Sequence, residues 1–187
     1  FTRGATDSIN IIANSLIKKF QDGGQVVITE LEHHSNYLPW MKICDNSNLE
    51  LKIVPVNENG IIDEQQIIDT CSDTTKILAI THMSNVTGQI LDIKKIKSSI
   101  SKDILIALDG CQSIAHCNID VQDLDCDFYS FSSHKLYGPS GVGILFGKQK
   151  ILEEMDPPFL GGGMINDVTL STFSYADLPN KFEPGTP

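Results

Sequence analysis

The chain has 187 residues, of which 41% are hydrophobic, and a formal net charge of -10 at pH 7, which suits one buried core better than two complete domains. The acidic balance argues against nucleic-acid binding, because that function needs clustered Lys and Arg to neutralise phosphates. The sequence has no apolar stretch long enough to span a membrane and no basic-then-apolar leader, so we expect neither a membrane protein nor a secreted one.

The first predicted element is a helix that begins directly after Gly4. Apolar residues recur at helical spacing from Ile9 to Phe20, which is the pattern of a helix with one buried face. Thr6 or Asp7 supplies a side-chain oxygen suited to an N-cap.

Strand-like and helix-like segments alternate along the rest of the chain. Six short runs are rich in β-branched or apolar residues, and four segments between them have helical potential. Continuous apolar runs such as ILIAL are typical of strands buried on both faces, so we predict a three-layer α/β/α domain with a mostly parallel sheet. The last run follows a Gly-Pro-Ser turn and returns antiparallel, which makes the sheet mixed. The predicted strands are 26–29, 51–56, 76–81, 104–109, 128–131 and 141–146, and the predicted helices are 36–41, 64–71, 92–100 and 148–154.

Polar side chains follow four of the predicted strands. In open α/β sheets the ligand lies beyond the carboxyl ends of the strands, so these residues are the candidates for a site. They are Glu32, His33, His34 and Asn36 after the first strand, His82, Ser84 and Asn85 after the third, Asp109 and Gln112 after the fourth, and Ser132, His134 and Lys135 after the fifth.

This set suits an aldehyde cofactor that carries a phosphate and a pyridine ring, as pyridoxal 5′-phosphate (PLP) does. Lys135 supplies an amine that can form a Schiff base. The carboxylate of Asp109 would keep the ring nitrogen protonated. Residues 4–6 offer free N–H groups at a helix N-terminus and a threonine hydroxyl for the phosphate, and Ser132 and His134 add further donors.

Each of these signals also has an ordinary structural explanation. A lone lysine at a strand end is most often a solvated surface residue, and Asp109 before Gly110 is common turn chemistry. Residues 4–6 could form only a helix cap, and Asn85 only a turn. His33 and His34 could be a surface pair, and Ser132 and His134 could simply end an edge strand.

The cysteines and the acidic run do not predict a metal site. The chain has five cysteines and no CxxC spacing, which favours reduced thiols in a cytosol-like compartment. The group Cys111, His116, Cys117 and Cys126 matches no common zinc spacing. The aspartates between 120 and 127 lack the glycine and the closing glutamate of a calcium loop. We expect no metal, and we interpret the glycines at 161–163 as a turn.

Several ordered motifs together carry a resemblance that covers nearly the whole chain. They are FTRGATDSIN, TELEHHSNYLPW, SNVTGQILDI, ALDGCQSIAH, DCDFYSFSSHKLYGPSGVGILFGK, PPFLGGGMI and KFEPGTP. With these motifs the chain resembles the class V aminotransferase-like PLP enzymes of fold type I. Within that family it is most similar to the cysteine desulfurases and selenocysteine lyases of sulfur mobilisation.

The resemblance implies a role for each candidate residue. Lys135 forms the Schiff base with PLP and moves the substrate Cα proton, Asp109 pairs with the pyridine nitrogen, and His33 stacks on the ring. Thr186 resembles the residue that reaches the phosphate of the neighbouring subunit's cofactor, which implies a homodimer. The remaining cofactor-binding positions are Gln112 and Asn85 on the side of the phenolic oxygen, and Ala5, Thr6, Ser132 and His134 at the phosphate.

The implied activity is removal of sulfur from L-cysteine to leave L-alanine, with the sulfur held as a persulfide on an enzyme cysteine. A sulfur-acceptor protein, a part in iron–sulfur cluster assembly, and a cytoplasmic or organelle-matrix location would follow. Related reactions remain open, namely selenocysteine lysis, epimerisation and transamination of a related amino acid. A different class, a non-catalytic scaffold that keeps the fold, also remains open.

Two positions depart from the family pattern, and one part of the family's architecture is missing. Ala5 stands where a second threonine is common, and Cys111 stands where alanine is usual, so we expect Cys111 to be a packing residue. The chain starts at Phe1 and stops at Pro187. We expect 1–187 to be the PLP-binding large domain of a longer protein, without an N-terminal segment and without the C-terminal small domain. That domain supplies the sulfur-accepting cysteine and a carboxylate-binding arginine, so the fragment alone should not be fully active.

Overall fold

A six-stranded sheet forms the centre of the computed structural model, which describes residues 1–185. The strand order is β2-β1-β3-β4-β5-β6. The first five strands in this order are parallel, and β6 runs antiparallel to β5. The prediction of a mixed, mostly parallel sheet is therefore confirmed. The strands are β1 (Gly24–Thr29), β2 (Leu49–Val54), β3 (Thr75–Thr81), β4 (Leu105–Asp109), β5 (Phe128–Ser132) and β6 (Gly143–Gly147).

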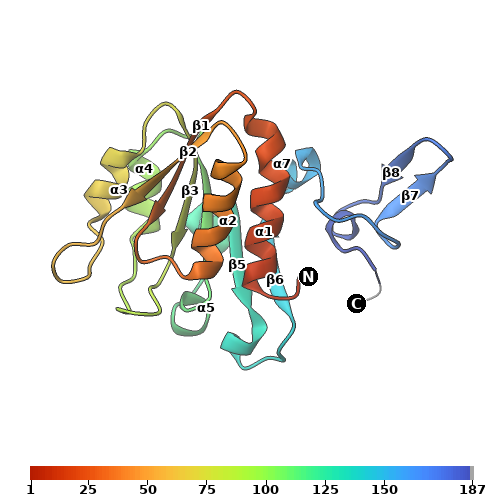
Figure 1. Cartoon of the computed structure of the whole chain (residues 1–187). Coiled ribbons are helices and arrows are strands. Elements are labelled where there is room, and N and C mark those ends of the chain that lie inside the picture. Colours follow the sequence, from red (N-terminus) through yellow and green to blue (C-terminus); the bar gives the residue numbers. More distant parts are fainter. Residues whose placement is uncertain (186–187) are drawn as a thin grey trace.

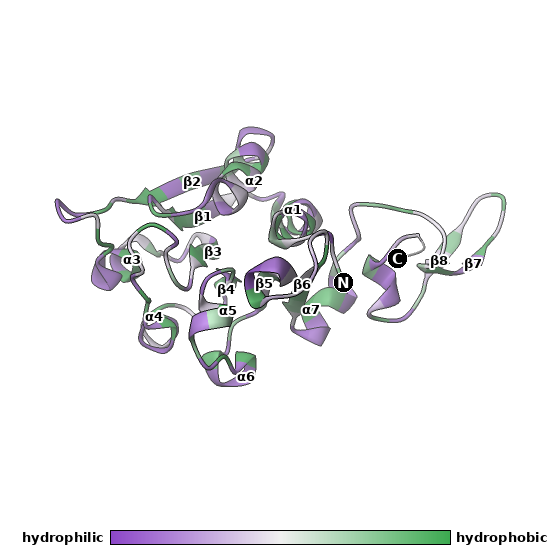
Figure 2. Cartoon of the chain, turned by 90° about the horizontal axis from the view of Figure 1, so that it is seen from below, coloured by the Kyte–Doolittle hydropathy of each residue, from purple (hydrophilic) through white to green (hydrophobic). Residues whose placement is uncertain are grey.

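Helices cover both faces of this sheet, as Figures 1 and 2 show for α1 and α2 on one face and α3 and α4 on the other. This is the expected three-layer α/β/α arrangement. The helices are α1 (Ala5–Leu16), α2 (His34–Asp45), α3 (Glu64–Thr70), α4 (Ile93–Ser99), α5 (Ser113–His116), α6 (Val121–Leu124) and α7 (Gln149–Glu154), with 3-10 turns η1 (Ile17–Phe20), η2 (Ser133–Leu136) and η3 (Asn180–Phe182).

The central strands bury side chains on both faces, which explains their continuous apolar runs. Along β1, Val26 and Ile28 join the cluster under α1 and α2, whereas Val27 joins the cluster under α3 and α4. Along β3, Ile77 and Leu78 divide between the same two clusters. Successive side chains of a strand point to opposite faces, so a strand covered on both sides must be apolar at every position.

The start of α1 lies against β6 because two glycines allow close approach. Thr2 and Gly143 form an isolated antiparallel bridge, and a Cβ atom on Gly143 would lie 2.5 Å from the Cα atom of Gly4. Gly4 itself has φ 150°, in the region that favours glycine. This contact holds the helix N-terminus beside the carboxyl ends of the strands.

The helix begins after Gly4 as predicted, but the predicted N-cap is wrong. Gly4 is the N-cap residue, and no side chain caps the helix. Thr6 and Asp7 both lie inside the first turn, because the helix starts at Ala5. The Thr6 hydroxyl is therefore not used by the backbone of α1.

The ends of the six strands differ from the predicted ends by two residues or fewer. The strand expected at 51–56 is β2, which ends at Val54 before Pro55, where an N–H is missing. The helix expected at 36–41 extends over His34–Asp45.

Two short helices and a β-hairpin were not predicted. The helices α5 and α6 have four residues each, too few to show a helical period. The chain after residue 156 forms a hairpin of β7 (Ile165–Val168) and β8 (Phe173–Tyr175), which extends away from the sheet (Figure 1).

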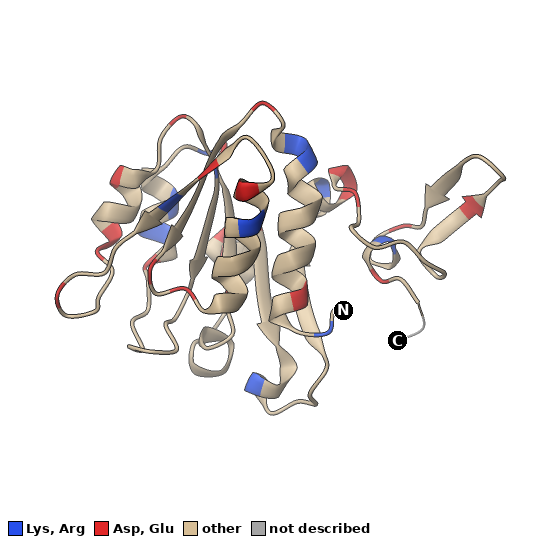
Figure 3. Ribbon diagram, viewed as in Figure 1, with Lys and Arg blue, Asp and Glu red and all other residues tan. Residues whose placement is uncertain are grey.

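Charged side chains are spread over the fold, with acidic residues among the Lys and Arg (Figure 3). Lys95 of α4, for example, pairs with Glu64 of α3, and Lys148 pairs with Asp125. Among the described residues, no helix is long and apolar enough to cross a membrane.

Candidate active site

A cavity of about 250 Å³ opens where the carboxyl ends of β3, β4 and β5 meet the N-terminus of α1. This is the edge of the sheet at which the strand-end residues were expected to converge. Nine of the ten predicted site residues line it, and the tenth, Thr186, lies outside the described residues. The lining residues are Ala5, Thr6, His33, Ser35, Thr81, Met83, Asn85, Asp109, Cys111, Gln112, Ser132, His134 and Lys135.

One end of the cavity is built from α1 and the last residue of β5. The backbone N–H of Ala5 donates to Ser132 Oγ at 2.8 Å, and Thr6 Oγ1 lies 2.7 Å from Ser35 Oγ. The N–H of Thr6 has no hydrogen-bond partner among residues 1–185. A helix N-terminus with a free N–H and nearby hydroxyls is suited to an anion.

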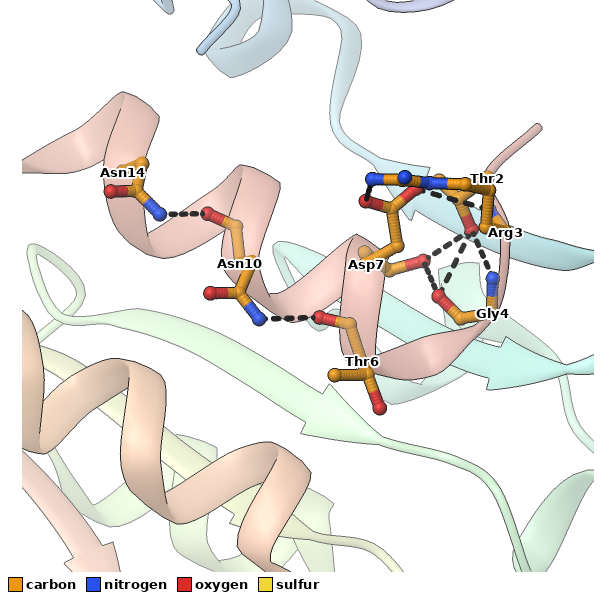
Figure 4. A network of polar contacts seen from close by, with 8 residues as sticks. Thr2, Arg3, Gly4, Thr6, Asp7, Asn10 and Asn14 are labelled. Atoms are coloured by element: carbon orange, nitrogen blue, oxygen red, sulfur yellow. Dashed lines mark hydrogen bonds and ion pairs between the residues drawn. The ribbon is translucent and has the colours of Figure 1, made fainter. Parts of the chain in front are cut away.

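An ion pair at the start of the same helix neutralises the negative charge of Asp7, which would otherwise oppose the binding of an anion there. The guanidinium of Arg3 donates to Asp7 Oδ1 at 2.8 Å, and the Arg3 N–H donates to Asp7 Oδ2. Burial alone would raise the pKa of Asp7, but the hydrogen bonds and charge of Arg3 hold it below its ordinary value. In Figure 4 the Thr6 side chain points away from this pair. Asp7 is therefore paired on one side of the helix, while Thr6 faces the other.

The lining of the cavity also includes a buried carboxylate. Asp109 ends β4 and is 5% exposed. Its Oδ1 accepts from the Cys111 N–H at 2.9 Å, and in the sheet it lies opposite Thr81 on one side and Ser130 on the other. An ionised carboxylate held this way is a suitable partner for a protonated ring nitrogen.

Cys111 lies beside this carboxylate as a protonated thiol. Burial, with the charge of Asp109 and a hydrogen bond to it, raises the pKa of Cys111 to about 12. A thiol, unlike a thiolate, is a poor nucleophile. The expectation that Cys111 packs rather than reacts agrees with this environment.

Lys135 projects from η2, the 3-10 turn that directly follows β5. Its side chain is half-buried, and within the described part of the chain its amine forms neither a hydrogen bond nor an ion pair. The side chains of Asn85, Gln112 and His134 likewise make no hydrogen bond to residues 1–185. The cavity thus contains several polar groups whose bonding capacity is left for a ligand.

His33 is the N-cap residue of α2, and its ring is held by Ser35. The backbone N–H of Ser35 donates to His33 Nδ1 at 3.1 Å. Because a backbone N–H can only donate, Nδ1 is the acceptor and the neutral ring carries its proton on Nε2. One hydrogen bond therefore sets both the cap and the tautomer of His33.

Ser35 lines the cavity but was not among the predicted site residues. Its hydroxyl lies within hydrogen-bond distance of both Thr6 Oγ1 and His33 Nδ1, so it links α1 to the N-cap of α2. The signal was its place two residues after His33 in the quoted motif. Thr81 and Met83 also line the cavity, and Thr81 Oγ1 donates to the Met83 carbonyl.

The metal-like groupings of the sequence do not converge in the described residues. Among residues 1–185, no three His, Cys, Asp or Glu side chains form a group that could hold a metal ion. Asp120 is the N-cap residue of the short helix α6. Asp125 is its C-cap residue and pairs with Lys148.

The fold and this cavity define the class of protein. The aminotransferase class-V family matches residues 1–187, and the chain belongs to that family. Within it, the chain is similar to proteins named cysteine desulfurase. It is 44% identical over 190 residues to the cysteine desulfurase of Pectobacterium atrosepticum and 46% identical over 189 residues to a probable cysteine desulfurase of Staphylococcus epidermidis, in each case across 100% of this chain.

Solved structures agree with these relatives. The cysteine desulfurase CsdA of Escherichia coli, in its S-sulfonic acid form, superposes with a TM-score of 0.94 at 37% identity, over 100% of this chain and 47% of that one. C-DES, solved as a K223A mutant with glycine covalently linked to its PLP cofactor, shares the fold with a TM-score of 0.87 at 23% identity, over 99% of this chain and 50% of that one. The chain spans 47% and 46% of the length of the two curated relatives.

Proposed function

We propose that the full-length protein is a PLP-dependent cysteine desulfurase, which removes sulfur from L-cysteine and leaves L-alanine, and that this chain supplies its cofactor site. One observation carries the proposal. The half-buried amine of Lys135, unpaired among the described residues, lines the same cavity as the buried carboxylate of Asp109 and the N-terminus of α1.

The side chains and the free N–H of the cavity fit PLP at three separate points. Asp109 would hold the ring nitrogen, and His33 would lie against the ring. Thr6 and Ser132, together with the free N–H at the start of α1, would hold the phosphate. Ala5 contributes its N–H to Ser132 rather than a hydroxyl to the anion, and Ser35 brings a hydroxyl to this end of the cavity.

In the proposed reaction, each of these residues has a separate role. When bound, PLP supplies an aldehyde for an amine and an electron-withdrawing ring. Asp109, as a buried anion, keeps a proton on the ring nitrogen. Lys135 Nζ takes the proton from the substrate Cα. Asn85 and Gln112 would donate to the oxygen on the ring, which fixes the orientation of the cofactor.

We propose that the cysteine that accepts the sulfur belongs to a part of the protein outside this chain. Burial raises the pKa of Cys44 and Cys71 to about 11, and of Cys111 and Cys126 to about 12. Cys117 does not line the cavity. Protonated, buried thiols are poor sulfur acceptors. The persulfide would therefore form on a cysteine of the whole protein that lies outside this chain.

A homodimer, with Thr186 reaching the phosphate of the neighbouring subunit's cofactor, is the assembly that we propose. Large apolar side chains exposed on the hairpin and the segment before it support a contact there. They are Phe159, Leu160, Val168, Leu170 and Phe173. A sulfur-acceptor protein and a part in iron–sulfur cluster assembly follow from the proposed reaction. The five unpaired cysteines favour a reducing compartment, the cytoplasm or an organelle matrix.

The reaction itself is tested by incubating the full-length protein with PLP and L-cysteine. We expect alanine and, with a thiol reductant present, sulfide in equal amounts. Release of alanine from selenocysteine but not from cysteine would assign the protein to selenocysteine lysis. Keto-acid formation without sulfide would assign it to transamination, and a racemised substrate would indicate epimerisation. Failure to bind PLP at all would favour the non-catalytic scaffold.

A further inference from the structure

Glu32 is a buried carboxylate that lies next to the cavity without lining it. It is 7% exposed and directly precedes His33. Its Oε1 accepts from Thr29 Oγ1 at 2.7 Å and from the Thr81 N–H at 3.0 Å, and its Oε2 accepts from Asn36 Nδ2 at 2.6 Å. Thr29 ends β1, Thr81 ends β3, and Asn36 lies in the first turn of α2. One carboxylate therefore joins two strand ends to the helix that His33 caps.

Asp109 is the charged group that acts on Glu32 from the neighbouring strand. Burial is the main cause that raises the pKa of Glu32 to about 7, and the charge of Asp109 raises it further, while the three hydrogen bonds oppose both. The groups that face Glu32 from β1, α2 and β3 are Thr29, Asn36 and the Thr81 N–H, none of which is charged. Glu32 therefore titrates near neutral pH, and the charge at Asp109 influences it.

Both protonation states of Glu32 can keep a hydrogen bond with each of its three partners, and only the ionised state also gives the Thr29 hydroxyl hydrogen an acceptor. When Glu32 is ionised, the Thr29 hydroxyl donates to Oε1. When Oε1 is protonated, it can donate to Thr29 Oγ1 instead, because a hydroxyl both donates and accepts. The Thr81 N–H and Asn36 Nδ2 still find acceptors in either state. The proton can leave without creating an unpaired buried group, so the His33 segment stays in place.

We propose that Glu32 is a positioning residue that holds His33 in register with Asp109, and that it releases a proton when a cation pairs with Asp109. The inference rests on the proposed function in one respect, because the cation would be the protonated ring of PLP. In this step the O–H bond of Glu32 breaks, the electron pair stays on Oε1, and the proton goes to water. A cation at Asp109 offsets a like charge, which favours ionised Glu32. By linkage, cofactor binding strengthens as Glu32 ionises.

Trp40 provides a spectroscopic reporter of this network. Its Nε1 donates to Asn36 Oδ1 at 3.0 Å, and Asn36 in turn donates to Glu32. The full-length protein would be labelled with 5-fluorotryptophan, and the Trp40 resonance would be assigned with Trp40→Phe. In the cofactor-free protein we expect the fluorine shift of Trp40 to titrate with a midpoint near 7.

Two variants of Glu32 separate the charge from the geometry. Glu32→Gln removes the titration and sets an amide N–H₂ against Asn36 Nδ2, so two donors face each other. The double variant Glu32→Gln/Asn36→Asp restores a donor and an acceptor, and the aspartate also accepts from Trp40. We expect PLP affinity, measured by fluorescence titration, to fall about tenfold in the single variant and to recover to within about threefold in the double variant. Glu64→Gln, at an exposed ion pair on α3, is the control.

The coupling to Asp109 has its own test, and the first part of that test needs no cofactor. Asp109→Asn removes the like charge and should lower the Trp40 midpoint, and loading the wild type with PLP should lower it as well. The proposal is overturned if Glu32→Gln retains the titration, if Asp109→Asn leaves the midpoint unchanged, or if the double variant binds PLP as weakly as the single one. If the wild type binds no PLP while Asp109→Asn still lowers the midpoint, the proposed function fails and the charge coupling between Glu32 and Asp109 stands.

Discussion

The backbone N–H of Ala5 donates a hydrogen bond to Ser132 Oγ at 2.8 Å, across 127 positions of the sequence. This contact fixes the start of α1 against the end of β5, the two elements that form the proposed phosphate end of the cavity. Since Ser132 accepts from Ala5, its own hydroxyl hydrogen is free to donate to a phosphate. The same side chain therefore has a structural role and a proposed binding role.

Ser132→Ala should destabilise the protein as well as weaken cofactor binding. The variant leaves the buried Ala5 N–H without its acceptor, which costs about 1–3 kcal/mol. Urea unfolding of the cofactor-free full-length protein measures this loss. Ser98→Ala, on the exposed face of α4, removes a hydroxyl that bonds a local carbonyl and should change stability by less than about 0.5 kcal/mol. Equal stability of the Ser132 variant and wild type would contradict the contact.

Substitutions of His33 should separate its cap from its ring. His33→Ala removes the acceptor for the Ser35 N–H and should cost about 1 kcal/mol of unfolding free energy. His33→Asn keeps a side-chain acceptor at the N-cap, so most of that stability should return. Neither variant keeps the ring, and both should bind PLP more weakly than wild type. If Asn restored PLP binding together with stability, the ring would have no role of its own.

The tautomer of His33 should survive the loss of the Ser35 hydroxyl. In Ser35→Ala the backbone N–H still donates to His33 Nδ1, so the proton stays on Nε2. Long-range ¹H–¹⁵N NMR of the labelled protein distinguishes the two ring nitrogens. Protonation of Nδ1 in neutral His33, in either protein, would contradict the capping contact.

Stability should depend on pH through Glu32. Its pKa is about 7 in the folded protein against an ordinary value of 4.5, so the folded state binds more protons between these values. The free energy of unfolding that Glu32 contributes is greatest below about pH 4.5 and is lost as the pH rises through 7, by up to about 3 kcal/mol. Unfolding at pH 5 and pH 8 should therefore differ less in Glu32→Gln than in wild type. Identical differences in the two proteins would show that Glu32 does not titrate in this range.

Cys111 should resist alkylation in the folded protein. With its pKa raised to about 12 from an ordinary value of 9.0, its thiolate fraction at pH 8 falls about a thousandfold. Iodoacetamide labelling followed by peptide mass analysis measures the rate, and the urea-unfolded protein is the control. Rapid labelling of Cys111 in the folded protein would make it a reactive thiol rather than a packing residue.

The sequence was most informative where one physical rule governs a whole segment. Apolar runs located the six strands, because strands covered on both faces tolerate few polar residues. The strand-end rule then brought together Asp109, Lys135 and His33, although each alone had an ordinary explanation. Resemblance assigned their roles in cofactor binding, and these roles stay predictions. Thr186, the proposed contact with the neighbouring subunit, lies outside the described residues and also stays a prediction.

Other features could not be predicted, because they depend on contacts between distant parts of the chain. The helix α1 begins at Ala5 without a side-chain cap, since Gly4 lies against Gly143. Sequence reasoning expected a cap from Thr6 or Asp7, which are the only local candidates. The contact between Ser35 and Thr6 joins residues 29 positions apart, and no local sequence pattern indicates it. Likewise, nothing beside Glu32 in the sequence indicates that Thr81 donates to it.

The central claim, that Lys135 is the residue that binds PLP covalently, has one direct measurement. The full-length protein is loaded with PLP, reduced with borohydride, digested, and mapped by mass spectrometry. We predict a pyridoxyl group on Lys135 and on no other lysine, together with loss of the adduct in Lys135→Ala. A stable reduced adduct on another lysine, or one that persists in Lys135→Ala, would contradict this account.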